Sequence, residues 1–289
     1  GVNTKARGNY SSAHGYYSTA DGLYSNVSGY YSSAEGDFSM VYGHYDTVTG
    51  YVSTSIGAYN DVSGDYAYVL GRSNEVTGNY GTTVGYNNTN KAYSGFASGY
   101  SNVIEGNYSF VGGNLSYVSG LYAMAYGYLD SVTGNYAVAL GSRNKSKGAY
   151  STTTGILNVA TGPGAFATGY LNNVDGDYAV ALGRNGEALS DYSVTAGFYN
   201  TTSGSYAVAL GGYNKANGTS SVAIGYGDSA KGNNSVAIGY LVKATDLSSV
   251  AIGRQTVADG DRGTAIGLLD SASGYGSLAI GSYCKTSGT

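Results

Sequence analysis

The sequence predicts an all-β fold, a parallel β-roll (a β-solenoid) whose coils are 14 residues long. Glycine recurs with a period of seven: stepping in sevens from Gly1 to Gly288 meets glycine at 39 of 42 positions. Successive heptads alternate in character, so the true repeat is 14 residues. A heptad is too short for a stable helix, and a glycine inside a helix costs about 1 kcal/mol. Each heptad is therefore expected to be a short strand followed by a corner.

The two kinds of heptad differ in their apolar residues. The apolar heptad reads Gly-x-Tyr-Ser/Ala-Val-Ala-Ile/Leu, as in residues 134–140, and the polar heptad reads Gly-x-x-Asn/Asp/Ser-x-Val/Ala-Thr/Ser/Asp, as in residues 127–133. Residues 8–287 hold 20 such pairs, since 280/14 is 20. Stacked coils would pair the backbone of each coil with the coils before and after it.

The glycines mark the predicted corners. We expect a corner glycine either to have a positive φ or to touch the backbone of the neighbouring coil. Gly141 and Gly211 are two such glycines, and the turns at Ala92, Ser190 and Asp246, where another residue replaces glycine, are expected to be altered.

Side-chain alternation in the apolar heptads predicts self-association. Val236 and Ile238 share one face of a strand and Ala237 takes the other, and the pattern repeats in many coils. We expect Val and Ile to fill the interior of the roll, so that the alanine column packs against other copies of the chain. The alternative is a monomer with an exposed alanine stripe, which a continuous apolar patch makes less favourable.

The composition offers little material for catalysis. The chain has two histidines, His14 and His44, and one cysteine, Cys284, and its 18 acidic residues form no repeated pair. We therefore expect no enzyme, no cofactor and no metal site. A net charge of −4 gives no general basis for binding nucleic acid. No apolar run approaches the roughly 20 residues of a membrane span, so no direct membrane contact is expected within this fragment.

One repeated motif resembles a known family. Ser-Val-Ala-Ile-Gly occurs at 221–225, 235–239 and 249–253, and degenerate versions such as Ala-Val-Ala-Leu-Gly extend back through residue 137. These repeats resemble the head repeat of the YadA-like trimeric autotransporter adhesins. Some members bind collagen through Asn-Ser-Val-Ala-Ile-Gly followed by a serine. Here Asn234–Gly239 matches, but Val242 replaces that serine.

The resemblance implies more than a fold. It implies a left-handed roll, a homotrimer, and display on a bacterial cell surface, anchored in the outer membrane, with the N-terminal end pointing away from the cell. Residues 1–289 are then expected to be a single YadA-like head domain of about 20 coils. The signal peptide, stalk and membrane anchor are expected to lie outside this fragment of a longer surface protein.

Tyrosine is concentrated towards the N-terminus. There are 12 tyrosines in residues 1–71, 10 in 72–144, 7 in 145–217 and 4 in 218–289. Residues 8–71 also hold six acidic residues and no Lys or Arg, a composition that could steer a basic partner. Many tyrosines recur in a column that could simply stiffen the roll. Others lie in the polar heptads and are our candidates for ligand binding: Tyr16, Tyr30, Tyr45, Tyr59, Tyr86 and Tyr100.

Three function classes are compatible with these patterns. The first is an adhesin head that binds a host matrix component or epithelial receptor as a trimer: a collagen-type protein, fibronectin, laminin or a receptor of the immunoglobulin family. The second is a passive spacer of a surface fibre, and the third is an ice-binding solenoid. A spacer would be uniform along its length and an ice binder would carry one regular ladder, so the tyrosine gradient favours the adhesin.

Overall fold

The computed structural model describes residues 1–288 and confirms the predicted all-β parallel β-roll. Among these residues the structure has strands and no helix. Strands of five residues (long strands) alternate with strands of two residues (short strands), and one of each with two corners makes a 14-residue coil. The coils fall into two units, Gly1–Arg143 and Asn144–Thr289, which we call the N-terminal and the C-terminal unit and describe separately.

Within residues 1–143 the long strands carry even numbers and the short strands odd numbers. The long strands are β2 (Ser12–Tyr16), β4 (Asn26–Tyr30), β6 (Met40–His44), β8 (Thr54–Ala58), β10 (Tyr68–Arg72), β12 (Thr82–Tyr86), β14 (Phe96–Tyr100), β16 (Phe110–Asn114), β18 (Met124–Tyr128) and β20 (Val138–Ser142). The short strands are β1 (Lys5–Ala6), β3 (Thr19–Ala20), β5 (Ser33–Ala34), β7 (Thr47–Val48), β9 (Asp61–Val62), β11 (Glu75–Val76), β13 (Thr89–Asn90), β15 (Val103–Ile104), β17 (Tyr117–Val118) and β19 (Ser131–Val132).

The C-terminal unit repeats the same alternation. Its long strands are β22 (Thr152–Ile156), β24 (Phe166–Tyr170), β26 (Val180–Arg184), β28 (Val194–Phe198), β30 (Val208–Gly212), β32 (Val222–Tyr226), β34 (Val236–Tyr240), β36 (Val250–Arg254), β38 (Thr264–Leu268) and β40 (Leu278–Ser282). Its short strands are β21 (Lys145–Ser146), β23 (Val159–Ala160), β25 (Asn173–Val174), β27 (Glu187–Ala188), β29 (Thr201–Thr202), β31 (Lys215–Ala216), β33 (Ser229–Ala230), β35 (Lys243–Ala244), β37 (Val257–Ala258), β39 (Ser271–Ala272) and β41 (Lys285–Thr286).

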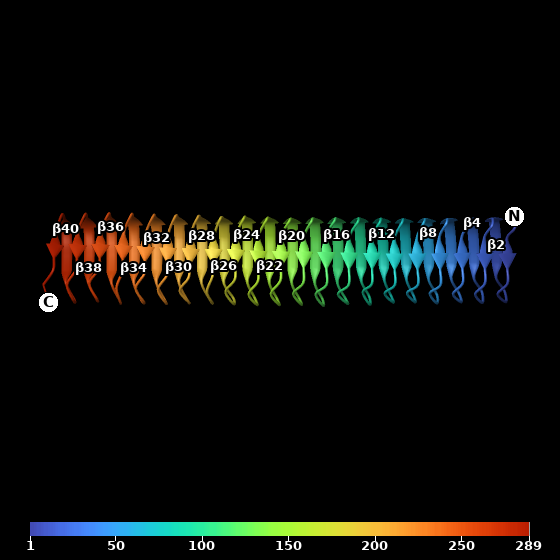
Figure 1. Ribbon diagram of the computed structural model, residues 1–289, viewed down its shortest axis with the longest axis horizontal. Helices are drawn as coiled ribbons and strands as arrows, with labels where there is room; N and C mark the ends of the chain where they lie inside the picture. The colour runs from blue at the N-terminus through green and yellow to red at the C-terminus, as the bar shows by residue number, and fades with distance from the viewer. Residues whose placement is uncertain (289) are drawn as a thin grey trace. The chain divides into compact units, whose positions relative to one another are not determined.

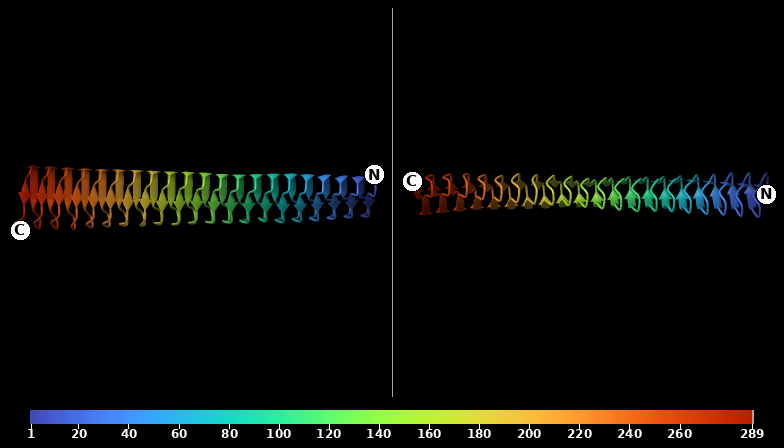
Figure 2. Two further views of the ribbon diagram at one scale, coloured as in Figure 1. Left: turned by 45° about the horizontal axis from the view of Figure 1, so that its top comes forward. Right: turned by 90° about the horizontal axis from the view of Figure 1, so that it is seen from below.

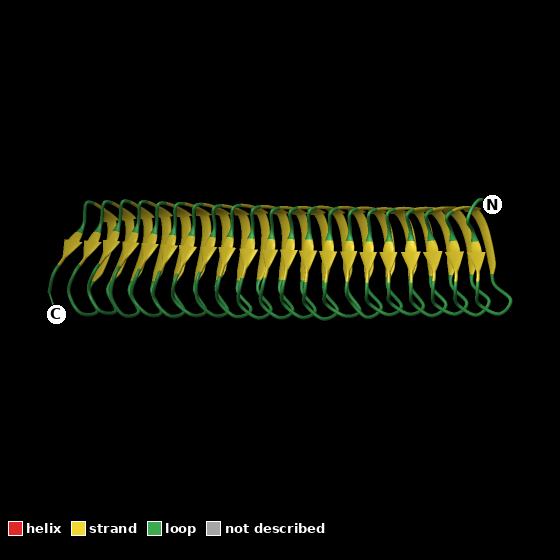
Figure 3. Ribbon diagram, turned by 45° about the vertical axis from the view of Figure 1, so that its right-hand side comes forward, coloured by secondary structure: helices red, strands yellow, loops and turns green. Residues whose placement is uncertain are grey.

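In each unit the long strands form one parallel sheet and the short strands form a second (Figure 1). The register between neighbouring coils is always 14 residues: Tyr68 of β10 pairs with Thr82 of β12, and Glu75 of β11 pairs with Thr89 of β13. The loops run along the two edges where the sheets meet, as the green segments in Figure 3 show. Figure 2 shows the two layers from two further sides. Equivalent positions of the repeat therefore form straight columns within each unit.

The interior between the two sheets reverses our expectation for the alanine column. Ala237 is 0% exposed within a single chain, whereas Val236 and Ile238 on the same strand are only partly buried. The expected assignment of the two faces was therefore wrong. The space between the sheets is thin, and the second residue of every long strand, which fills it, is Ala, Val, Ser or Thr. The larger Val and Ile side chains lie on the outer face of the long-strand sheet.

A column of polar side chains also runs inside each unit. Asn74 is buried, its side-chain amide donates to Asn60 Oδ1 at 3.0 Å, and the same amide donates to the Gly85 carbonyl at 2.9 Å. Asn88 repeats this pattern one coil later, donating to Asn74 Oδ1 at 3.1 Å. We call this column the asparagine ladder; it satisfies polar groups at a corner that water does not reach. From the sequence alone these residues are predicted only to belong to polar heptads.

Both reasons given for the glycines are found: the close approach to the neighbouring coil in two sets of glycines, and the positive φ in one of these sets only. Glycines in register with Gly15 include Gly141 (φ +128°) and Gly211 (φ +116°), which are the fourth residues of long strands. Glycines in register with Gly8 lack a positive φ, but a Cβ on Gly218, for example, would overlap the carbonyl of Gly232. Ala92, Ser190 and Asp246 all belong to this second set, where no positive φ is needed.

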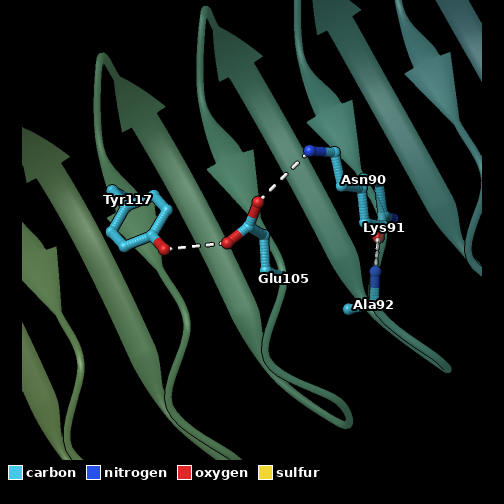
Figure 4. Close-up of polar contacts among 5 residues, drawn as sticks. All are labelled: Asn90, Lys91, Ala92, Glu105 and Tyr117. Carbon is cyan, nitrogen blue, oxygen red and sulfur yellow. Dashed lines mark hydrogen bonds and ion pairs between the residues drawn. The ribbon is translucent and has the colours of Figure 1, made fainter.

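The turn at Ala92 is altered as expected. Its N–H donates to Asn90 Oδ1 at 3.2 Å (Figure 4), while the N–H of Gly78, one coil earlier, donates to the Asn90 carbonyl. Gly95 makes room for this arrangement, because a Cβ there would lie 2.7 Å from both Ala92 Cβ and Asn90 Oδ1.

The ordinary turn bond, from the N–H three residues later, is kept at all three exceptions: at Ala92 (3.3 Å), at Ser190 (3.3 Å) and at Asp246 (3.2 Å). Ser190 adds a hydrogen bond that glycine could not make, from its hydroxyl to the Ser203 carbonyl at 2.6 Å. At Asp246 the turn bond shows no sign of the expected change.

Candidate ligand-binding surface

The corner that follows most long strands exposes two neighbouring side chains. The first belongs to the last residue of the strand and the second to the next residue, which has a left-handed backbone: Tyr17 (φ 51°) and Tyr31 (φ 55°) are examples. Residues other than glycine rarely adopt this conformation, which costs about 1–2 kcal/mol. Their N–H groups donate to the previous coil, as Tyr31 does to the Tyr16 carbonyl at 2.9 Å. Two columns of exposed side chains result.

In the first coils of the N-terminal unit both columns are aromatic. The rings of Tyr17 and Tyr31 stack with centroids 4.9 Å apart, and those of Tyr31 and Tyr45 stack at 5.1 Å. Edge contacts join the two columns, as between Tyr30 and Tyr31 at 4.8 Å. We define the N-terminal aromatic patch as the rings connected in this way: Tyr16, Tyr17, Tyr30, Tyr31, His44, Tyr45 and Tyr59.

The structure brings together four of the six candidate tyrosines. Tyr16, Tyr30, Tyr45 and Tyr59 belong to the patch, and all six candidates are exposed, between 37% and 49%. The remaining two stack on each other, with the rings of Tyr86 and Tyr100 5.3 Å apart.

Ala58 interrupts the first column between His44 and Arg72. Arg72 links the two groups of tyrosines, because its Cζ lies 5.4 Å from the Tyr59 ring centroid and 6.0 Å from that of Tyr86.

Sequence reasoning missed four members of this surface. Tyr17, Tyr31, His44 and Arg72 were not among the candidates, although one sequence signal pointed to the first three. The dipeptides Tyr16-Tyr17, Tyr30-Tyr31 and His44-Tyr45 recur exactly 14 residues apart, so their side chains had to form two adjacent columns. His14 lies on the outer face of β2, away from the corner columns.

Crowding of tyrosines affects the electrostatics of the patch. The pKa of Tyr31 is raised above 10.0, first by desolvation and then by the neighbouring tyrosines Tyr16, Tyr30, Tyr17 and Tyr45. The Tyr31 phenol therefore stays neutral and keeps its hydrogen-bond donor at physiological pH.

Not every acid that we counted in residues 8–71 is available to a partner. Asp46 is 0% exposed and lies in the asparagine ladder. Asp61 on β9 and Glu75 on β11 are exposed and pair in register beside the patch.

The opposite corner, after each short strand, carries a second aromatic column. Rings contact one another from coil to coil between residues 10 and 136. Where the usual position holds Val52 or Ser94, the preceding residue supplies Tyr51 or Tyr93 instead: Tyr10, Tyr24, Phe38, Tyr51, Tyr66, Tyr80, Tyr93, Tyr108, Tyr122 and Tyr136. One ring in every coil is the pattern of a stacking column that supports the roll.

Ion pairs are few on the short-strand side. Lys91 Nζ lies 3.2 Å from Glu105 Oε1, and the Tyr117 hydroxyl donates to Glu105 Oε2 at 2.8 Å (Figure 4). Together these contacts lower the pKa of Glu105, the hydrogen bond from Tyr117 more than that from Lys91. Both partners of the ion pair are exposed, so its contribution to stability is small.

Residues 1–288 show no pocket and no group of three His, Cys, Asp or Glu side chains able to hold a metal ion. In the same range we find no helix that is long and apolar enough to span a bilayer. The exposed side-chain columns are therefore the surfaces to consider for binding.

Comparison with known families finds one match. The model of the YadA head domain repeat matches residues 133–152, 160–185, 203–227, 229–241 and 244–268. No curated protein matches the chain. The matched repeats coincide with the coils in which the sequence motif was recognised, and their 14-residue coils form the predicted parallel β-roll. The matched ranges are therefore similar to YadA head repeats, and this family implies an adhesin-type head exposed at the cell surface.

Proposed function

We propose that this chain is the head of a homotrimeric adhesin on a bacterial outer membrane, and that it binds a host protein through the N-terminal aromatic patch. The observation that carries the proposal is the patch itself. Seven contiguous aromatic side chains lie at a corner whose backbone is already paired to the neighbouring coils. Exposed tyrosines are typical of binding surfaces, because they offer large amphipathic contacts at low entropic cost.

The trimer is supported by the outer face of the long-strand sheets. The first and third residues of the long strands form this face, and none of these positions holds Asp, Glu, Lys or Arg. Its residues include Val222, Ile224, Val236 and Ile238, which remain partly exposed in a single chain. An uncharged and largely apolar face of this extent favours contact with identical faces of other copies. We propose this face, in place of the alanine column, as the trimer interface.

Three copies of the patch would strengthen weak contacts with a clustered receptor. The host ligand is proposed to be a matrix protein of the collagen, fibronectin or laminin type or an epithelial receptor of the immunoglobulin family. The tyrosine gradient continues to favour this function over a spacer or an ice binder, since the patch occupies only the first coils.

The test is a binding screen of the full chain against these host proteins. The double variant Tyr31→Leu/Tyr45→Leu is expected to lose binding, while the matched variant Tyr192→Leu/Tyr206→Leu, in the stacked column of the other corner, keeps it. Equal binding by both variants would contradict the assignment to the patch. A measurement of thermal hysteresis on the same sample decides whether the chain binds ice instead.

A further inference from the structure

Most arginines of this chain lie over tyrosine rings at the corners, which indicates that these rings attract guanidinium groups. The sequence has six arginines, and five of them place Cζ within 6.0 Å of a tyrosine ring centroid. Arg184, for example, lies 5.8 Å from the Tyr170 ring and 5.9 Å from the Tyr199 ring. A guanidinium over an aromatic face gains a cation–π attraction. None of the chain's eight lysines is a corner residue of this kind; they lie on or beside the short strands.

The N-terminal aromatic patch has the same corner geometry without arginines of its own. Residues 8–71 contain no Lys or Arg, so within the patch only Tyr59, at its edge, has an arginine beside it, which is Arg72. Arg72 lies over the ring of the residue 13 positions earlier. The same relation places residue 58 beside Tyr45, and residue 58 is alanine. The position from which an arginine would cover Tyr45 is thus occupied by a methyl group.

Exposed carboxylates lie on the neighbouring short strands. Asp61 comes two residues after Tyr59, and Glu75 is its registered neighbour on β11. The ion pairs recorded for residues 1–288 join Arg7 to Asp21 and Lys91 to Glu105, and neither involves these two acids. Aromatic rings together with uncompensated carboxylates complement a planar cation.

We propose that the patch binds an arginine side chain of a protein partner, whose guanidinium lies over Tyr45 beside Ala58 with Asp61 as the nearby counter-charge. The inference rests on the proposed adhesin function and adds the chemistry of the ligand. Partner segments that present arginine rather than lysine are preferred, because the guanidinium is planar and more weakly hydrated than an ammonium group.

The test uses the full chain and two fluorescent nine-residue probes, oligoarginine and oligolysine, with affinity read by fluorescence anisotropy. We expect oligoarginine to bind about five-fold more tightly than oligolysine, the factor that about 1 kcal/mol gives. Tyr45→Leu is expected to remove this preference, and Tyr45→Phe, which keeps a ring, to reduce it less.

A second variant tests the site without removing any ring. Ala58→Arg should place the chain's own guanidinium over Tyr45 and weaken oligoarginine binding about five-fold or more. Ser119→Arg adds the same charge on the short-strand face and serves as the control. Equal affinities for the two probes, or equal effects of the two added arginines, would overturn the inference. If the host-protein screen still depends on Tyr31 and Tyr45 in that case, the adhesin proposal stands and only the arginine preference fails.

Discussion

Asn60 Oδ1 accepts two hydrogen bonds from Asn74, one from the backbone N–H and one from the side-chain amide, both at 3.0 Å. These two hydrogen bonds therefore join two successive coils at a buried corner. Asn74 Oδ1 in turn accepts the corresponding bonds from the next ladder residue, Asn88, at 3.0 and 3.1 Å. Each asparagine in the ladder thus depends on its neighbour on either side.

Replacing one member should be costly. Asn74→Leu leaves the Asn88 amides without their acceptor and the Gly85 carbonyl without its donor, at about 1–3 kcal/mol for each buried group left unpaired. We expect the free energy of unfolding, measured with urea, to fall by at least about 2 kcal/mol. Asn217→Leu, at an exposed site, is the control, and a similar loss there would contradict the role of the ladder.

Asp46 is an incompletely satisfied member of the ladder in the N-terminal unit. It accepts from the Asn60 N–H at 2.8 Å, but its Oδ2 has no hydrogen-bond partner, and burial raises its pKa above the ordinary 3.8 despite the bonds from Asn60. A raised pKa in the folded state means that the stabilising protonated form is fully present below about pH 3.8 and is lost as the pH rises through the folded value.

Asp46→Asn should therefore stabilise the protein at neutral pH by about 1 kcal/mol or more, since the new amide supplies a donor that the carboxylate lacks. The gain should shrink towards pH 3, where Asp46 is protonated. Urea unfolding of both proteins from pH 3 to 8 measures this, with Asp61→Asn, at an exposed site, as the control. A constant difference at all pH values would show that titration of Asp46 is not its cause.

Gly211 should tolerate no side chain. Its φ of +116° is strained for any other residue, and a Cβ would overlap the Gly225 carbonyl of the next coil. Gly211→Ala is expected to cost at least about 2 kcal/mol of unfolding free energy. Gly276, which has φ +62° and no atom within 4 Å of an added Cβ, is the matched control, and Gly276→Asn should cost much less. Similar losses at the two sites would rule out contact with the neighbouring coil as the cause.

The outer face of the long strands should control oligomeric state. Light scattering on the wild-type chain is expected to give three times 29.5 kDa. Ile238→Arg would bury a charge in every copy of the interface and should produce monomers that keep their β-structure. Ser229→Arg, on the short-strand face, should leave the trimer intact. A wild-type monomer at micromolar concentration would contradict the proposed interface.

The period of the glycines was enough to predict the coils and their register, because a strict 14-residue repeat leaves few ways to pair strands. The choice of inner and outer face was not predictable in the same way. Val236 and Ala237 are both apolar, and only the width of the space between the two sheets decides which of them fits inside. The patch was found in part, since Tyr16 and Tyr30 follow corner glycines, whereas the contact of Arg72 with Tyr59, at the edge of the patch, was known only from their distance.

The constant register has a consequence for how such a chain can change its length. Because Tyr68 pairs with Thr82 and every neighbouring residue pairs with the residue 14 positions on, removing one whole coil from within a unit brings equivalent positions into contact again. A deletion of seven residues would instead set an apolar heptad against a polar one and place an asparagine-ladder residue against a different column. Insertions and deletions are therefore expected to be tolerated in multiples of 14 residues. Duplication or deletion of whole coils can then lengthen or shorten the chain while the surface chemistry at its N-terminal end is left as it was.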